Sequence, residues 1–173
     1  MEVKINEERS KEYKLFETVE ITAPNGQIIP CAKRGSVLIP ISKVAVFGMG
    51  KVEFPEREEL ELLRADRRAD QRAFSKNQTK VKRLRFLEEG PEYNYKRSQG
   101  NLKVLLNVGM VDSVDNVNEI ISHLLDIGAT ITVDTRVRHP SRLEAPNGQM
   151  KVVSTWKILE DGTKYLTTLH FEG

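Results

Sequence analysis

The sequence contains one cysteine and one tryptophan, and aromatic residues make up only 6 % of it. Cys31 has no second cysteine to pair with, which excludes an intramolecular disulfide framework. No run of about 18 apolar residues occurs, which excludes a transmembrane helix. The charged stretch over residues 1–14 lacks the apolar segment of a secretory signal, and its glutamates do not suit a transit peptide. We therefore expect a cytoplasmic protein with no membrane partner.

The chain also lacks the common catalytic and ligand-binding signatures. It has no GxSxG, HExxH or Cys–His motif, and its three histidines do not have the spacing of metal ligands. It has no ribonucleoprotein, KH, zinc-finger or helix-turn-helix signature. Residues 48–51, Gly-Met-Gly-Lys, lack the spacing and the Ser or Thr of a phosphate-binding loop and predict only a turn. These absences favour a non-catalytic protein without a metal or cofactor.

What the sequence does contain is one concentrated cationic segment. The 173 residues carry a net charge of only +2, but residues 64–86 hold nine basic residues against two acidic ones, a local charge of +7. The other residues together carry a net charge of −5. A charge gathered in this way has more effect on binding partners than the total charge does.

The cationic segment and its aromatic neighbours favour nucleic-acid binding. Lysine and arginine bind phosphates with release of counterions, and arginine also stacks on bases. Phe74 and Phe86 lie in the segment and Tyr93 and Tyr95 shortly after it, and basic residues interleaved with aromatics are typical of grooves that bind single strands. We predict binding of RNA or single-stranded DNA through a set of basic residues: Arg64, Arg67, Arg68, Arg72, Lys76, Lys80, Lys82, Arg83, Arg85, Lys96 and Arg97.

The same residues leave two other functions open. In the first, the arginines dock on an acidic protein surface, as in an assembly factor, adaptor or inhibitor of viral or mobile-element type. A stripe of small side chains would then form a helix–helix contact, also within a homo-oligomer: Leu62, Ala65, Ala69 and Ala73. In the second, a magnesium-dependent nuclease, carboxylates hold the metal and a lysine orients the attacking water. Its candidates are Glu119, Asp134, Gln149 and Lys151, with Gln149 where an acid is usual.

The first half of the chain predicts short strands and then a charged helical segment. Strands are expected within residues 15–54, with a hairpin turn at Asn25-Gly26 and apolar runs over 37–41 and 44–47. Residues 55–75 predict a helix, because Pro55 and the glutamates that follow it suit a first turn.

A second helix or a strand should follow to about Glu89. Gly90-Pro91 is a strong stop signal, so residues 90–100 predict a linker. The cationic segment thus lies on a long helical element that either bridges two sheets or projects as an arm.

The last part of the chain predicts a β-α-β-β-β unit. Its expected elements are a strand over 102–108, a helix over 113–128, a strand over 130–138 and two hairpin strands around Asn147-Gly148 and Asp161-Gly162. Gly128 is placed to end the helix in a left-handed conformation. Trp156 falls on the apolar face of its strand and is expected in the core.

These elements predict an α+β fold with an antiparallel or mixed sheet. The expected organisation is a β-rich region over 1–54, the basic helical segment and linker over 55–99, and the α+β unit over 100–173. The three parts form either separate units or one domain.

Overall fold

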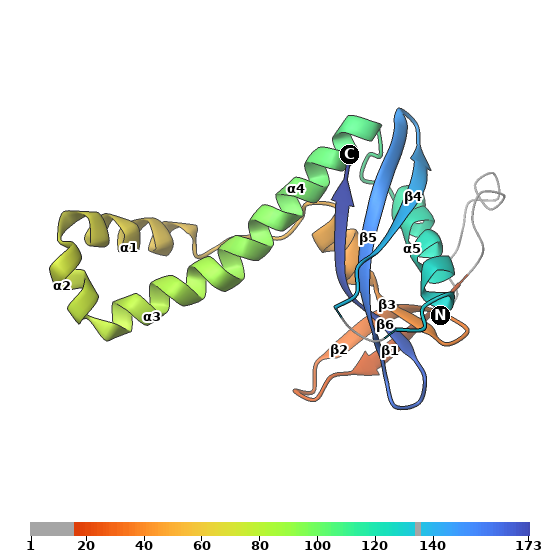
Figure 1. Cartoon of the computed structure of the whole chain (residues 1–173), viewed down its shortest axis with the longest axis horizontal. Helices are drawn as coiled ribbons and strands as arrows, with labels where there is room; N and C mark the ends of the chain where they lie inside the picture. Colours follow the sequence, from red (N-terminus) through yellow and green to blue (C-terminus); the bar gives the residue numbers. More distant parts are fainter. Residues whose placement is uncertain (1–15, 134–135) are drawn as a thin grey trace.

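The computed structural model describes residues 16–133 and 136–173, which form a mixed β-sheet, a helix packed on it and a long helical arm (Figure 1). Within these residues the sheet has six strands in the order β1-β2-β3-β6-β5-β4. The strands are β1 (Glu17–Thr22), β2 (Ile28–Arg34), β3 (Val37–Pro40), β4 (His139–Ala145), β5 (Gly148–Ile158) and β6 (Lys164–Glu172). Neighbouring strands are antiparallel except β3 and β6, which are parallel. The predicted α+β class and the mixed sheet are confirmed.

The predicted hairpins are confirmed at both ends of the sheet. Gly26, between β1 and β2, has φ +85°, and Gly148, at the start of β5, has φ +130°. Glycine adopts these positive φ values without the steric cost of a side chain. The Asn25 side-chain oxygen accepts a hydrogen bond from the Gln27 N–H at 2.9 Å, which closes the first turn.

Helix α5 (Val114–Ala129) covers one face of the sheet and forms the main core with it (Figure 1). The Ser113 hydroxyl accepts a hydrogen bond from the Asn116 N–H at 3.1 Å and so caps the start of the helix, as predicted. Trp156 is 1 % exposed, which confirms its place in the core. Gly128 lies inside α5 rather than ending it. A Cβ there would lie 2.8 Å from the Trp156 ring, so glycine lets helix and sheet approach closely.

The arm consists of two helical stretches that fold back on each other. The outgoing stretch is α1 (Arg57–Ala69), α2 (Gln71–Lys76) forms the end, and the return runs without a break through α3 (Gln78–Leu87), the π-helical turn η2 (Glu88–Glu92) and α4 (Tyr93–Val108). Figure 1 shows the arm projecting far from the sheet. A small core of its own holds it together: Leu60, Leu63, Phe74, Leu84 and Leu87, with Phe54 and Val81 packed against them.

Two capping residues bend the arm. The backbone of Asp70 is extended, and its carboxylate accepts a hydrogen bond from the Ala73 N–H at 3.0 Å. The Asn77 side chain accepts one from the Lys80 N–H at 3.2 Å. Each cap ends one helix and starts the next, so the helix predicted over 55–75 divides at Asp70. Residues 76–89, which the sequence left open, are helical over α3.

Three hydrogen bonds fix α4 to the sheet half of the molecule. The Asn101 side-chain oxygen accepts from the Phe171 N–H at 2.9 Å, at the edge of β6. The Ser98 hydroxyl donates to the Phe47 carbonyl at 2.8 Å, and the Gln99 amide donates to the Gly50 carbonyl at 3.0 Å. Ser98 and Asn101 are fully buried, so α4 is packed into the sheet half of the molecule.

The continuous helix through η2 and α4 shows that two predictions were wrong. Residues 90–100 are not a linker, because Pro91 lies in the π-helical turn, where the wider backbone spacing accommodates its ring and its missing N–H. Residues 102–108 are not a strand. Their leucines and valines alternate, but Leu105 and Val108 also recur at helical spacing and are buried on one face of α4.

Two further predicted strands are wrong. Residues 43–48 form the π-helical turn η1 (Lys43–Gly48) in place of a strand over 44–47. The described part of 130–138 is irregular, and β4 begins only at His139. Ile131 is buried, but Val133 is 51 % and Val137 is 43 % exposed, so the alternation of this segment does not correspond to one buried face.

Candidate nucleic-acid interface on the helical arm

Every residue of the predicted basic set lies on the arm, but the residues differ in how they are used. Four of them contact carboxylates within the arm: Arg64, Lys80, Arg83 and Lys96. Six others have exposed side chains that no carboxylate of residues 16–133 or 136–173 pairs with: Arg67, Arg68, Arg72, Lys76, Lys82 and Arg85. We call these six the unpaired basic surface.

Arg64 is the most constrained of the paired residues. Its guanidinium donates to both carboxylate oxygens of Glu92, at 2.8 and 2.7 Å, and to Glu88 at 2.9 Å. The side chain of Glu92 is only 12 % exposed. Hydrogen bonding to Arg64 lowers the pKa of Glu92 and raises that of Arg64. Arg64 therefore ties α1 to η2 and is not free to bind a ligand.

Two ion pairs nearer the surface also join α1 to α3. Arg83 forms a two-pronged contact with Glu59, at 2.7 and 2.8 Å, and the Lys80 ammonium lies 2.8 Å from Asp66. The hydrogen bond from Arg83 lowers the pKa of Glu59. All four side chains are about half exposed, so these pairs are exchangeable contacts of modest strength.

Folding separates the charges of the arm along its length. The acidic residues of 53–61 and of 88–92 lie in the half of the arm nearer the sheet. There Glu92 bonds to Arg64 of the outgoing stretch, and Glu59 bonds to Arg83 of the returning stretch. The cationic segment over 64–86 occupies the far end (Figure 1). The tip of the arm is therefore strongly positive, and its root holds most of the arm's carboxylates.

A hollow of about 820 Å³ opens between the helices at the tip. Three members of the unpaired basic surface, Arg67, Arg72 and Arg85, line its rim, and apolar side chains such as Phe74 and Leu84 lie at its base. Glu88 and Glu89 close the end that faces the root. The hollow combines cations with an apolar floor, which suits a ligand that carries phosphates and bases.

The aromatic residues that the sequence singled out have different roles. Phe74 is 7 % exposed and belongs to the arm core, and Tyr95 packs against Phe54 with the ring centroids 5.7 Å apart. Phe86 is 59 % exposed beside the Arg83 guanidinium, and Tyr93 is 54 % exposed beside that of Arg97. Phe86 and Tyr93 are therefore the two that can stack on a base.

The small-residue stripe lies exposed on the arm, and its predicted helix–helix contact, which needs a partner chain, stays a prediction. Leu62 is 64 % exposed, and Ala65, Ala69 and Ala73 are exposed as well. The buried face of α1 is instead made by Leu60 and Leu63. The face of α1 that carries the stripe is exposed to solvent, because the larger side chains of Leu60 and Leu63 pack α1 on α3.

The magnesium-dependent nuclease stays a prediction, because its candidate Asp134 lies outside the described residues. Of its other candidates, the Gln149 amide donates to Glu144, and Lys151 lies 3.4 Å from Glu172. No cluster of three or more His, Cys, Asp or Glu side chains in the described residues is arranged to hold a metal ion. Within the same residues, no helix is long and apolar enough to cross a membrane.

No protein-family model matches this sequence, and no curated protein matches it either. The function is therefore inferred from the geometry and chemistry of the chain itself.

Replacing Arg64 by methionine should destabilise the arm by about 1–2 kcal/mol, because Glu92 would be left largely buried without its donor. Folding lowers the pKa of Glu92 below its ordinary value of 4.5, so the pair contributes fully above that pH and is lost as the pH falls through the lower folded value. The stability gap between wild type and Arg64→Met should therefore shrink as the pH falls below 4.5 and through the lower folded pKa of Glu92. Urea unfolding followed by far-ultraviolet circular dichroism measures both effects.

Arg83→Met is the matched control, since it removes an exposed pair that joins α1 to the neighbouring helix α3. It should change stability much less than Arg64→Met. Equal effects of the two substitutions, or a gap that persists at low pH, would contradict the role given to the Arg64–Glu92 contact.

Proposed function

We propose that this protein binds RNA or single-stranded DNA through the tip of its helical arm, without catalysing a reaction on it. The observation that carries this proposal is the unpaired basic surface, six cationic side chains with no carboxylate partner in the part of the chain that the structure describes. Closely spaced phosphates bind such a surface by displacing counterions.

The neighbouring groups support a single strand over a duplex. Phe86 and Tyr93 are more than half exposed, each with an arginine over its ring, and the bases of a single strand are free to stack on such residues. The bases in a duplex are already stacked on one another. The carboxylates beside Arg64 disfavour phosphates next to them, so the main phosphate contacts are expected at the far end of the arm, where the cations are unpaired.

The Arg67→Glu/Arg72→Glu variant tests the ionic part of the proposal. Both residues line the rim of the hollow at the tip. Titration of labelled single-stranded RNA, single-stranded DNA and duplex DNA by fluorescence anisotropy gives the affinity at about 50 and about 200 mM salt. We expect at least a tenfold loss of single-strand affinity at the lower salt, and a salt slope smaller by about 1.4, because each lost phosphate contact with a single strand removes about 0.7.

The control variant is Lys33→Glu/Lys157→Glu, which changes the net charge equally but on the sheet. Its affinity should stay within about twofold of wild type, since neither lysine lies on the arm. Equal weakening in the two variants, or no binding by the wild type at the lower salt, would refute the proposal. In the latter case the docking of an acidic protein surface would be the better account of the tip.

Phe86→Ala tests base stacking separately from charge. The substitution should weaken single-strand binding by about 1–3 kcal/mol and leave the salt slope unchanged, because an aromatic face is lost and no cation is removed. Leu62→Ala is the matched control, since Leu62 is a similarly exposed apolar side chain on the arm but has no ring. Anisotropy titrations that show equal losses for both variants would mean that Phe86 contributes no stacking.

A further inference from the structure

A second positively charged surface lies where α4 meets the sheet, on the face of the sheet opposite α5. In β5 and β6, Val152, Trp156, Leu169 and Phe171 point into the core. The intervening residues form three cross-strand pairs on the other face: Lys151 with Glu172, Val153 with His170, and Thr155 with Thr168. This face carries hydroxyls, an imidazole and charges, which are groups that bind polar ligands.

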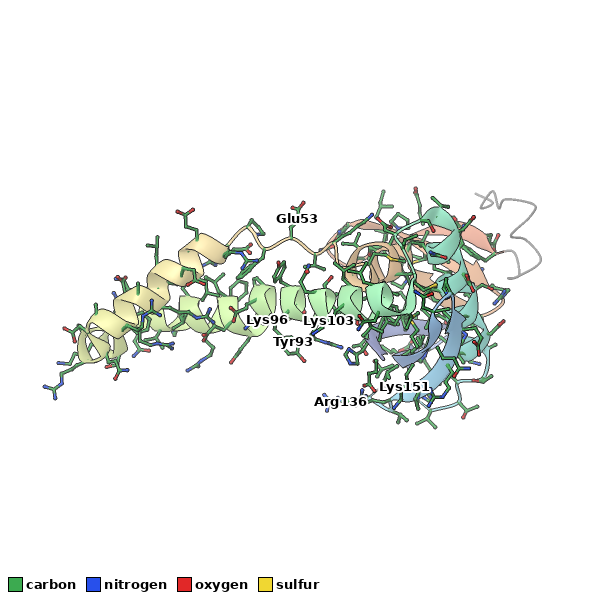
Figure 2. All side chains as sticks on the ribbon, turned by 90° about the horizontal axis from the view of Figure 1, so that it is seen from above. Glu53, Tyr93, Lys96, Lys103, Arg136 and Lys151 are labelled. Atoms are coloured by element: carbon green, nitrogen blue, oxygen red, sulfur yellow. The ribbon has the colours of Figure 1, made fainter. Side chains whose placement is uncertain are left out.

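Helix α4 turns this face into a hollow. β3 pairs only with the first residues of β6, Lys164 and Tyr165, and α4 lies against the edge of β6 beyond them. Tyr93 and Arg97, one turn apart on α4, reach over the sheet, and Arg138 approaches from the start of β4. Figure 2 shows Tyr93 and Lys151 on the same side of α4. The resulting hollow has a volume of about 360 Å³ and is lined by Tyr93, Arg97, Arg138, Val153, Thr155, Thr168 and His170.

The cations of the hollow outnumber its carboxylates. Arg97 contacts the rings of Tyr93 and Phe47, at 5.5 and 5.6 Å, and no carboxylate of the described residues pairs with it. Glu172 is shared: Arg138 lies 3.2 Å, Lys151 3.4 Å and His170 3.4 Å from its carboxylate. One carboxylate therefore contacts two cations and a histidine, so the hollow carries an excess of positive charge.

The hollow also holds groups that can form hydrogen bonds with a ligand. His170 Nδ1 is buried and has no partner in the part of the chain that the structure describes. Two threonine hydroxyls, those of Thr155 and Thr168, bond to each other at 2.5 Å and line the same wall. Burial, with repulsion from Arg97 and Arg138, lowers the pKa of His170, and Glu172 partly opposes this. The imidazole is therefore mostly neutral at pH 7 and can respond to a bound anion.

We propose that this hollow binds a phosphoryl group, with Arg97 and Arg138 as the charged donors and His170 and the threonine hydroxyls as further partners. Two guanidinium groups at one site match the geometry of a phosphate, whose oxygens accept paired hydrogen bonds. The volume is at the small end for ligand sites, which suits a single nucleotide unit. The phosphoryl group belongs either to a free nucleotide or to a strand that also contacts the arm, and only the second source rests on the proposed function.

Nuclear magnetic resonance of the full-length protein tests this site directly, because His170 reports on it and His123 serves as an internal reference. His123 is hydrogen-bonded to Ser141 at 2.8 Å, away from the hollow. The probes are inorganic phosphate, adenosine 5′-monophosphate and a short oligoadenylate, each compared with chloride at equal ionic strength. We expect a saturable shift of the His170 imidazole resonance and a raised His170 pKa, since a phosphate dianion favours the charged imidazolium. The resonance and pKa of His123 should not change.

Variants on both walls decide whether the shift comes from the hollow. Arg97→Gln and, independently, the more exposed Arg138→Gln should each weaken the apparent affinity at least tenfold. Lys103→Gln, at an exposed lysine farther along α4 (Figure 2), should leave it unchanged. A response to the mononucleotide identifies a free-nucleotide site, and a response to the oligoadenylate alone identifies a strand site. No saturable His170 shift with any probe, or a shift that both Arg97→Gln and Arg138→Gln retain, would overturn the proposal.

The proposal for the arm tip and the proposal for the phosphoryl site can be refuted independently of each other. Arg67→Glu/Arg72→Glu should weaken strand binding through the tip at least tenfold but leave the His170 response to adenosine monophosphate intact. If the anisotropy titrations show no strand binding while His170 still responds to the mononucleotide, the arm function is wrong and the phosphoryl site stands. If strands bind through the tip but His170 never responds, the phosphoryl site is wrong.

Discussion

The edge of β6 that β3 leaves unpaired is the constraint on which the architecture depends. An exposed strand edge presents backbone groups that need partners, and this one is covered by a helix. Asn101 supplies the acceptor for the Phe171 N–H from a fully buried position, and Ser98 ties the same helix to η1. Because α4 is fixed there over its second half, its first half and α3 must extend beyond the sheet. The direction of the arm and the position of Arg97 over the open face follow from this one contact.

Ion pairs within the arm determine both its shape and its chemistry. The carboxylates nearer the sheet neutralise Arg64 and Arg83 and join the outgoing helix to the returning one. Apart from Lys80, which pairs with Asp66, the cations nearer the tip have no carboxylate partner in the described residues, so the arrangement that stabilises the hairpin also concentrates free positive charge at the tip. The same division explains why the eleven predicted basic residues are not equivalent. Those nearest the carboxylates are structural, and those farthest from them are available to a ligand.

Local signals in the sequence predict the elements whose conformation is decided locally. Asn25-Gly26 specifies its hairpin, Ser113 marks the start of α5, and the charge of residues 64–86 identifies the candidate surface. The linker predicted from Gly90-Pro91 is wrong, because a π-helical turn tolerates a proline that would end an α-helix. The strand prediction for residues 102–108 is wrong because a short apolar run can fit both the alternation of a strand and the spacing of a helix. The contact of α4 with the edge of β6 favours the helix.

The charged and polar residues of the second hollow could not be found from the sequence at all. Tyr93 and Arg97 lie on α4, Arg138 precedes β4, and His170 is near the C-terminus, so no motif or spacing connects them. They meet only because α4 replaces a strand at the edge of β6. Of these residues, only Arg97 belonged to the predicted basic set. Their proximity depends on tertiary packing.

The central claim, that the arm tip binds a nucleic acid strand, is tested most directly by photo-crosslinking followed by peptide mapping. A single-stranded RNA with 4-thiouridine along its length would be bound to the full-length protein and irradiated. The account predicts crosslinks within residues 67–86, with Phe86 prominent, and further ones at Tyr93 if the strand continues to the root. Crosslinks confined to β1 and β2, or none at a concentration where binding is saturated, would contradict it.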